Sequence, residues 1–166
     1  MNIEVDLLLE AELAIDEDEV QRICEFVLAE EGVKRDCMVS VSSVDEDRMH
    51  ELNLEWRGQD KATDVLSLEC ERPDDPELAP FEPCELGDIV LAPSYIARQA
   101  KGFGTTVQNE TRLLLVHGML HLLGYDHMVE DEAQQMEARE DELLARLGAG
   151  SDLDEVTLTR HEEERS

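Results

Sequence analysis

The sequence is poor in basic residues. It has 14 Lys and Arg against 42 Asp and Glu, which gives a formal net charge of −28. Such a surface repels nucleic-acid phosphates, so it argues against nonspecific binding to RNA or DNA. The simplest interpretation is a solvated acidic surface that keeps the protein dispersed. The alternative is a surface that docks on a basic partner.

The acidic residues are distributed unevenly along the chain. Residues 1–56 carry 17 acids and four bases, and the segment 69–85 carries seven acids and one base. In contrast, the segments 57–68 and 86–127 are each neutral. The acidic charge therefore avoids the two segments that hold the candidate functional residues, at least along the sequence.

The sequence also lacks long apolar runs. Its first 20 residues contain no basic residue and many acids, which excludes an ordinary secretory signal peptide. No run approaches the ~20 apolar residues that a membrane-spanning helix needs. We therefore expect a soluble cytoplasmic protein with no membrane partner.

Cysteine is scarce, and no two cysteines have the spacing of a CxxC motif. The four cysteines are Cys24, Cys37, Cys70 and Cys84. In a cytosolic protein, isolated cysteines are usually small buried or incidental residues. The alternative is a second metal site, because Cys70 and Cys84 flank an acidic loop.

Aromatic residues make up only 4% of the chain, so Leu, Val and Ile must fill most of the core. A hydrophobic fraction of 42% suffices for a core, and 166 residues fit one domain. Alternating and β-branched segments predict strands at 3–9, 37–44, 63–69 and 87–92. Apolar residues at helical spacing predict helices between Asp16 and Gly32, from Asp45 to Trp56, and over 94–101, 107–123 and 128–147.

This order, β-α-β-α-β-β-α-α-α, predicts an α+β fold. We expect one domain over residues 1–147, with a sheet of about four strands covered by helices. The segment 70–86 holds four of the five prolines and should be a surface loop. Residues 148–166 are acidic and poor in apolar residues, which predicts a disordered tail.

The most informative motif reads HGMLHLLGYDH, from His117 to His127. His117 and His121 are four residues apart, so on a helix both rings lie on one face. Gly124 stands where the helix must end, because glycine tolerates the left-handed backbone that reverses the chain. The reversal returns His127 toward the other two. Three imidazoles with an open fourth position predict a zincin-like catalytic zinc site.

The motif lacks the general base of a zinc protease. A protease with this spacing carries Glu in the second position, where this chain has Gly118. Peptide hydrolysis is therefore disfavoured, since the leaving amine needs a proton from such a base. Asp126 could be a fourth ligand, could assist proton transfer, or could orient a histidine through a hydrogen bond. We favour the orienting role.

Cleavage of a phosphodiester depends less on such a base. The larger need is to neutralise the charge that develops on phosphorus, by a metal and a cation. Arg57 supplies a guanidinium that matches phosphate geometry, in the polar segment RGQDKATD with Lys61 nearby. The local sequence alone favours the plainer alternative, which is an exposed surface arginine.

Together with three further segments, the histidine motif resembles the YbeY-type family of bacterial rRNA maturation factors. Asn53, Trp56 and Arg57 resemble the Asn, Tyr and Arg that precede the family's central strand. Residues 63–67 read TDVLS and residues 86–89 read LGDI, as in that family. The resemblance covers roughly residues 3–147. Trp56 in place of Tyr, and Leu68-Glu69 in place of Phe-Pro, are departures that should require only local repacking.

The family consists of zinc-dependent endoribonucleases. The resemblance implies cleavage of single-stranded RNA in 16S rRNA 3′-end maturation, and a part in ribosome quality control. By position, His117, His121 and His127 would bind one Zn²⁺ ion, and Arg57 would contact the scissile phosphate. Arg57 and His117 are thus the expected catalytic residues. Either the RNA 2′-OH or a water molecule could be the nucleophile.

An alternative function remains open at this point. The chain could be a non-catalytic ribosome assembly factor in which the metal site stabilises the fold. The charge of −28 suits this alternative, because an acidic surface fits docking on basic ribosomal or assembly proteins.

Overall fold

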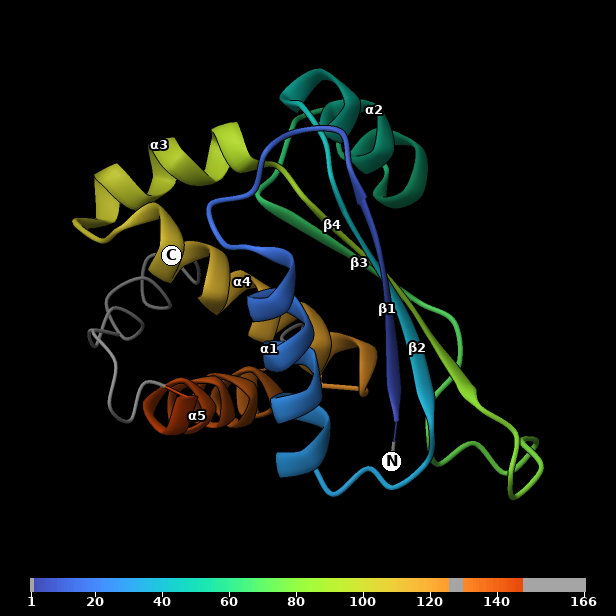
Figure 1. Cartoon of the computed structure of the whole chain (residues 1–166). Helices are drawn as coiled ribbons and strands as arrows, with labels where there is room; N and C mark the ends of the chain where they lie inside the picture. The colour runs from blue at the N-terminus through green and yellow to red at the C-terminus, as the bar shows by residue number, and fades with distance from the viewer. Residues whose placement is uncertain (1, 126–129, 148–166) are drawn as a thin grey trace.

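The computed structural model describes residues 2–125 and 130–147. Within them, helices and strands follow in the order that the sequence predicts (Figure 1). The strands are β1 (Ile3–Leu9), β2 (Cys37–Ser43), β3 (Val65–Glu69) and β4 (Cys84–Leu91). The helices are α1 (Glu17–Glu30), α2 (Glu46–Arg57), α3 (Pro93–Phe103), α4 (Val107–Leu122) and α5 (Glu130–Leu147).

The four strands form one mixed sheet in the order β1-β2-β4-β3. β1, β2 and β4 are parallel, whereas the edge strand β3 runs antiparallel to β4. Val65, at the start of β3, is therefore opposite Leu91, at the end of β4. This single α+β domain, with its four-stranded sheet covered by helices, confirms the predicted fold class.

The two faces of the sheet carry separate hydrophobic clusters. The larger cluster joins the sheet to α1, α4 and α5, whose labels in Figure 1 lie together on one side of the sheet. The smaller cluster contains Met49 and Leu52 of α2, packed with Leu66 of β3 and Val90 of β4. α2 therefore covers the opposite face of the sheet from α4.

Strand boundaries differ slightly from the sequence prediction. The loop expected over 70–86 gives its last three residues to β4, because Cys84 pairs with Cys37 of β2 in the sheet. β3 begins at Val65 rather than two residues earlier, since the Asp64 Oδ1 atom accepts a hydrogen bond from the Val65 amide at 2.7 Å. Gly87 of β4 has φ +134°, and a Cβ there would lie 2.0 Å from the Leu68 carbonyl oxygen. Close pairing of β3 with β4 therefore requires glycine.

The cysteines fit the plain interpretation given to them. Cys24, Cys37 and Cys84 are buried, Cys70 is exposed, and all four are free thiols. Burial is the main factor that raises the pKa of the Cys84 thiol to about 12, so it stays protonated near neutral pH. Among the described residues, neither Cys70 nor Cys84 belongs to a group of three or more side chains that could hold a metal, which disfavours the second metal site considered for them. None of the helices in the described residues is both long and apolar enough to cross a bilayer.

Candidate active site

The helix α4 carries the first two histidines through the centre of the domain. It begins at the N-cap Thr106, whose side chain accepts a hydrogen bond from the Asn109 amide at 3.1 Å. Most of its remaining turns are buried, including Leu113–Val116 and Gly118–Leu120. His117 and His121 keep partial exposure, and they are the polar side chains in the otherwise apolar C-terminal half of the helix.

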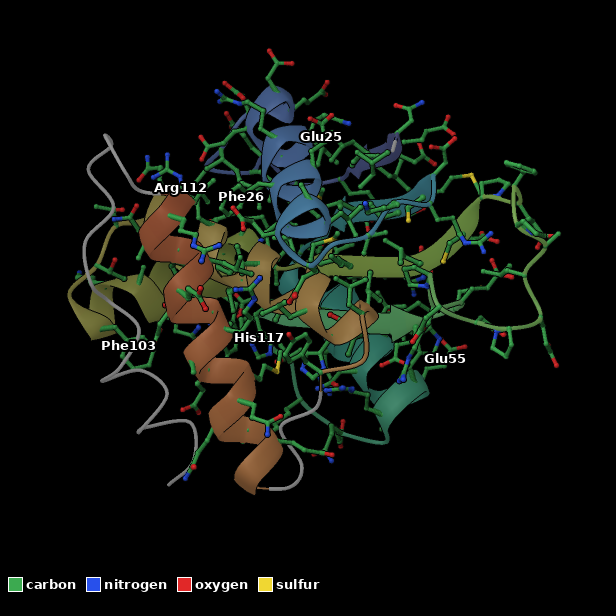
Figure 2. The ribbon with its side chains drawn as sticks, turned by 90° about the horizontal axis from the view of Figure 1, so that it is seen from below. Glu25, Phe26, Glu55, Phe103, Arg112 and His117 are labelled. Carbon is green, nitrogen blue, oxygen red and sulfur yellow. The ribbon has the colours of Figure 1, made fainter. Side chains whose placement is uncertain are left out.

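His117 and His121 lie together, as the four-residue spacing predicts. Their ring centroids are 4.7 Å apart, and the rings meet edge to face at 75°. In Figure 2 the labelled His117 lies beside α5. The two imidazoles thus lie side by side in the C-terminal half of α4.

The buried carboxylate of Glu140 contacts His117. Glu140 Oε1 forms a short hydrogen bond with His117 Nδ1, and Glu140 is fully buried. When a carboxylate holds Nδ1 in this way, it fixes the ring orientation and leaves Nε2 to bind a metal. A pair of this kind is the usual environment of a metal-binding histidine.

Sequence reasoning missed Glu140 and assigned the orienting role to Asp126, which lies outside the described residues. A signal was nevertheless present. Glu140 continues the spacing of the buried residues Ala133, Met136 and Leu143 on α5. A carboxylate in the apolar stripe of a helix needs a polar partner inside the protein, and its position could have suggested a histidine.

Two arginines fix α5 and, with it, Glu140. Arg139 donates a hydrogen bond to the Glu30 carbonyl oxygen at 2.8 Å and pairs with Glu31 at 3.4 Å. Arg146 pairs with the Glu30 carboxylate at 2.5 Å. Because Glu30 ends α1 and Glu31 follows it, these contacts tie α5 to the C-terminal end of α1. The Glu140–His117 contact thus joins α4 to a helix that is already anchored.

Gly118 is explained by packing of α4 against the sheet. A Cβ at Gly118 would lie 3.1 Å from two side-chain atoms of Ile89 in β4. Glutamate, the protease base, would have to enter this buried contact. The close packing of α4 on β4 therefore explains why this chain has glycine where a zinc protease has its glutamate.

The turn after α4 has the geometry that the sequence predicts. Gly124 has φ +104°, in the region that favours glycine, and the Tyr125 amide donates back to the Leu120 carbonyl at 3.1 Å. Burial, followed by a hydrogen bond to Glu31, raises the pKa of Tyr125. Tyr125 thus connects this turn to the end of α1.

The third predicted ligand, His127, also lies outside the described residues. Among residues 2–125 and 130–147, no group of three or more His, Cys, Asp or Glu side chains is arranged to hold a metal. The described part of the site fits a metal in two respects. The rings of His117 and His121 lie side by side, and Glu140 forms a hydrogen bond with Nδ1 of His117, which leaves its Nε2 for a metal. The complete three-histidine site stays a prediction.

Arg57 is the last residue of α2, and its side chain is exposed. Gly58, with φ +69°, ends the helix directly after it. Within the described part of the chain, the Arg57 side chain has no hydrogen bond or ion pair, so the structure does not bring it into contact with His117 or His121. The guanidinium is therefore available to a ligand.

Arg57 and the histidines come from helices on opposite faces of the sheet. α4 contacts β3, while α2 packs on the other face of the same strand. Because β3 is an edge strand, a substrate that touches both must pass around this edge or its end.

Comparison with known proteins identifies the family. The model of the family Endoribonuclease YbeY matches residues 9–148. The chain belongs to the YbeY endoribonuclease family. Endoribonuclease YbeY of Acinetobacter baumannii is 40% identical over 137 residues, which is 82% of this chain and 86% of that protein. Endoribonuclease YbeY of Staphylococcus saprophyticus is 37% identical over 135 residues, or 81% and 88% of the two chains.

The fold is also found among solved structures. The solution structure of TM1509 from Thermotoga maritima is 25% identical, with a TM-score of 0.55, and the match covers 90% of this chain and 95% of that one. The names of the curated relatives support endoribonuclease activity, and hence a nuclease of the hydrolase class, for the YbeY family member described here.

Three short segments of the YbeY resemblance have structural roles near Arg57. Asn53, 3% exposed, donates a hydrogen bond from Nδ2 to the Lys61 carbonyl at 2.9 Å. Asp64 accepts from Gln99 of α3 at 2.7 Å, which ties the start of β3 to that helix. Gly87 permits the close β3–β4 pairing. Asn53 and Asp64 thus fix the backbone on both sides of residues 57–63, whereas Gly87 lies opposite Glu69, at the other end of β3.

Proposed function

We propose that this protein is a zinc-dependent endoribonuclease specific for single-stranded RNA. We infer further that it acts in the cytoplasm, in 16S rRNA 3′-end processing, ribosome maturation and ribosome quality control. The observation that carries the proposal is the adjacent pair His117 and His121, with the buried Glu140 on Nδ1 of His117. Endoribonuclease relatives about 40% identical over most of the chain support the RNA substrate.

In this proposal His117, His121 and His127 hold one Zn²⁺ ion. When bound, zinc would supply a Lewis acid that polarises a phosphoryl oxygen. The Glu140 carboxylate accepts a hydrogen bond from Nδ1–H of His117 and so keeps the ring in the tautomer whose Nε2 can bind metal. His117 is therefore held in position by Glu140 before substrate arrives.

Arg57 supplies the second positive charge. Its guanidinium has no competing carboxylate among the described residues, so it can donate two parallel hydrogen bonds to a phosphate. Gly118 offers no general base, which fits a substrate that brings its own nucleophile. The RNA 2′-OH could attack the adjacent phosphate without any activated water. A 2′,3′-cyclic phosphate would form as the bond from phosphorus to the 5′-oxygen of the next nucleotide breaks, and the proton of the 2′-OH would pass through solvent to that leaving oxygen. Attack by water remains the alternative.

The acidic surface favours a second candidate function. A charge of −28 is poorly suited to unaided RNA binding but well suited to docking on basic ribosomal or assembly proteins. In this alternative the protein is a non-catalytic ribosome assembly factor, and the metal site stabilises the fold. Both functions could coexist if a basic partner brings the enzyme to its RNA.

A gel assay on labelled single-stranded RNA tests the proposal. It compares the wild type, the wild type with chelator and His121→Ala, all purified in parallel to control for a contaminating nuclease. We expect cleavage by the untreated wild type alone. Equal cleavage, or none, in all three samples would contradict a metal-dependent ribonuclease. Co-sedimentation with ribosomes without cleavage would favour the assembly factor.

A further inference from the structure

Two large hydrophobic side chains are exposed in the last turn of α2. Among the described residues, the exposed large hydrophobics are Leu8, Leu9, Leu54, Trp56 and Phe81. Leu54 is 47% exposed and Trp56 is 43% exposed, and both belong to the last turn of α2. Leu54 and Trp56 are two residues apart on the helix, so their side chains do not face each other and each is exposed on its own. Trp56 directly precedes Arg57.

The loop after this turn is folded back on α2. The Gln59 amide donates to the Asn53 carbonyl at 3.2 Å, and Asn53 Nδ2 in turn donates to the Lys61 carbonyl at 2.9 Å. His50 and Asp60 form a further hydrogen bond of 2.6 Å between side chains. These contacts fix the backbone around Trp56 without burying its ring. The backbone next to Trp56 is thus fixed before a ligand binds, and the indole ring stays exposed to that ligand.

Arg57 is the cation beside Trp56 that can receive a phosphate. Arg57 has no ion-pair partner in the described part of the chain, whereas Arg98 and Arg72 are bound to the carboxylates of Glu46 and Glu69. Residues 57–68 are neutral in a chain of charge −28. The segment that begins at Arg57 therefore adds no net negative charge, whereas Glu55, directly before Trp56, is an exposed carboxylate from which a phosphate must keep its distance.

We propose that Trp56 is a stacking platform for an unpaired RNA base, in the nucleotide whose phosphate binds Arg57. This inference rests on the proposed function and adds a binding site to it. An exposed indole accepts any base on its face, and an adjacent guanidinium can hold the backbone, which is how single-stranded nucleic acids are bound without sequence preference. A base inside a duplex has no free face to offer, so this surface selects single strands.

Trp56 is the only tryptophan of the chain, so its fluorescence reports on this site alone. The experiment titrates full-length His121→Ala, which should not cleave, with an RNA oligonucleotide of about ten nucleotides. We expect quenching of Trp56 by single-stranded RNA and much less by the same sequence as a duplex. Equal quenching by both, or no quenching by either, would overturn the inference.

Substitutions test the same site in the active protein. Trp56→Ala should raise KM or the dissociation constant for RNA roughly 5- to 100-fold, while Trp56→Phe keeps a ring and should retain most of the affinity. Leu54→Ala is the matched control, since it removes a side chain of similar exposure from the same turn. Thermal melting of each variant verifies folding.

The outcomes separate this inference from the proposed function. Cleavage by the wild type with an unchanged KM in Trp56→Ala would refute the stacking platform and leave the ribonuclease standing. Quenching by single-stranded RNA without any cleavage would support the platform in a non-catalytic RNA-binding protein. Absence of both would overturn both proposals.

Discussion

The two candidate halves of the active site are built in opposite ways. His117 belongs to a buried helix, its side chain is 15% exposed, and a fully buried carboxylate holds it. Arg57 belongs to the last turn of a surface helix and has no partner among the described residues. One half is fixed by the core, and the other half is presented to solvent.

This difference indicates that the buried half binds the metal and the exposed half contacts the substrate. Metal ligands must be rigid, because small displacements weaken the coordination geometry. A cation that meets a substrate phosphate must instead be unpaired beforehand, because an existing ion pair would have to break. Substitutions in the buried half should therefore alter metal content and stability, whereas those in the exposed half should alter RNA cleavage alone.

The largest effect is expected from the buried half. His121→Ala should lower cleavage of single-stranded RNA about a thousandfold, because the metal contributes several kcal/mol to transition-state stabilisation. Metal analysis and a cleavage time course check this result. His161→Ala, at a histidine to which the sequence gives no role, is the control. Wild-type cleavage by His121→Ala would show that the reaction needs no metal at this position.

Glu140→Gln should have a smaller effect on the same half. The amide keeps the size of the side chain but loses the charge that fixes His117 Nδ1, so metal affinity or activity should fall roughly 10- to 100-fold. Competition with a chelating dye measures the affinity. Glu132→Gln, on the exposed face of α5, is the matched control. If the two variants bind zinc equally well, Glu140 is a structural residue only.

The sequence predicted most of the fold because its patterns are local. Thr106 and Asp45 cap the helices they precede, as side chains of these types do, and Gly58 and Gly124 adopt the left-handed backbone after α2 and α4. The start of β4 escaped prediction for a non-local reason. Cys84 becomes a strand residue only through pairing with Cys37, which lies far away in the chain.

The site was predictable to a similar extent. The pairing of His117 with His121 follows from helix geometry alone. The partner of His117 did not follow, because Glu140 reaches it only after α5 packs across α1 and α4. The sequence likewise placed Arg57 in a loop after α2, whereas the structure makes it the last residue of that helix. His127, Asp126 and the tail 148–166 lie outside the described residues, and their roles stay predictions.

Removal of metal should lower stability moderately. A ligand at about 100 times its dissociation constant stabilises the folded state by about 2.7 kcal/mol, which corresponds to roughly 5–11 °C in melting temperature for a chain of this size. Differential scanning calorimetry with and without chelator measures the shift. An unchanged melting temperature after verified metal removal would count against a site that supports the fold.

The smallest effect is expected at Gly118. Gly118→Ala gains about 1 kcal/mol of helix propensity, but it inserts a methyl group 3.1 Å from Ile89, and such overpacking costs roughly 1–3 kcal/mol. The net result should be a fall in melting temperature equivalent to about 1 kcal/mol. Ile89→Val in the same chain opens the contact and should restore part of the loss, which a double-mutant cycle would reveal. Additive effects of the two substitutions would show that the contact between α4 and β4 does not limit this position.

Arg57→Ala provides the most direct test of the division between the two halves. The measurement combines zinc content, melting temperature and cleavage rate of the purified variant, with Arg48→Ala on the same helix as control. We predict unchanged zinc content and melting temperature, with cleavage reduced roughly 100-fold or more. Cleavage at the wild-type rate, or loss of zinc from Arg57→Ala, would contradict the account.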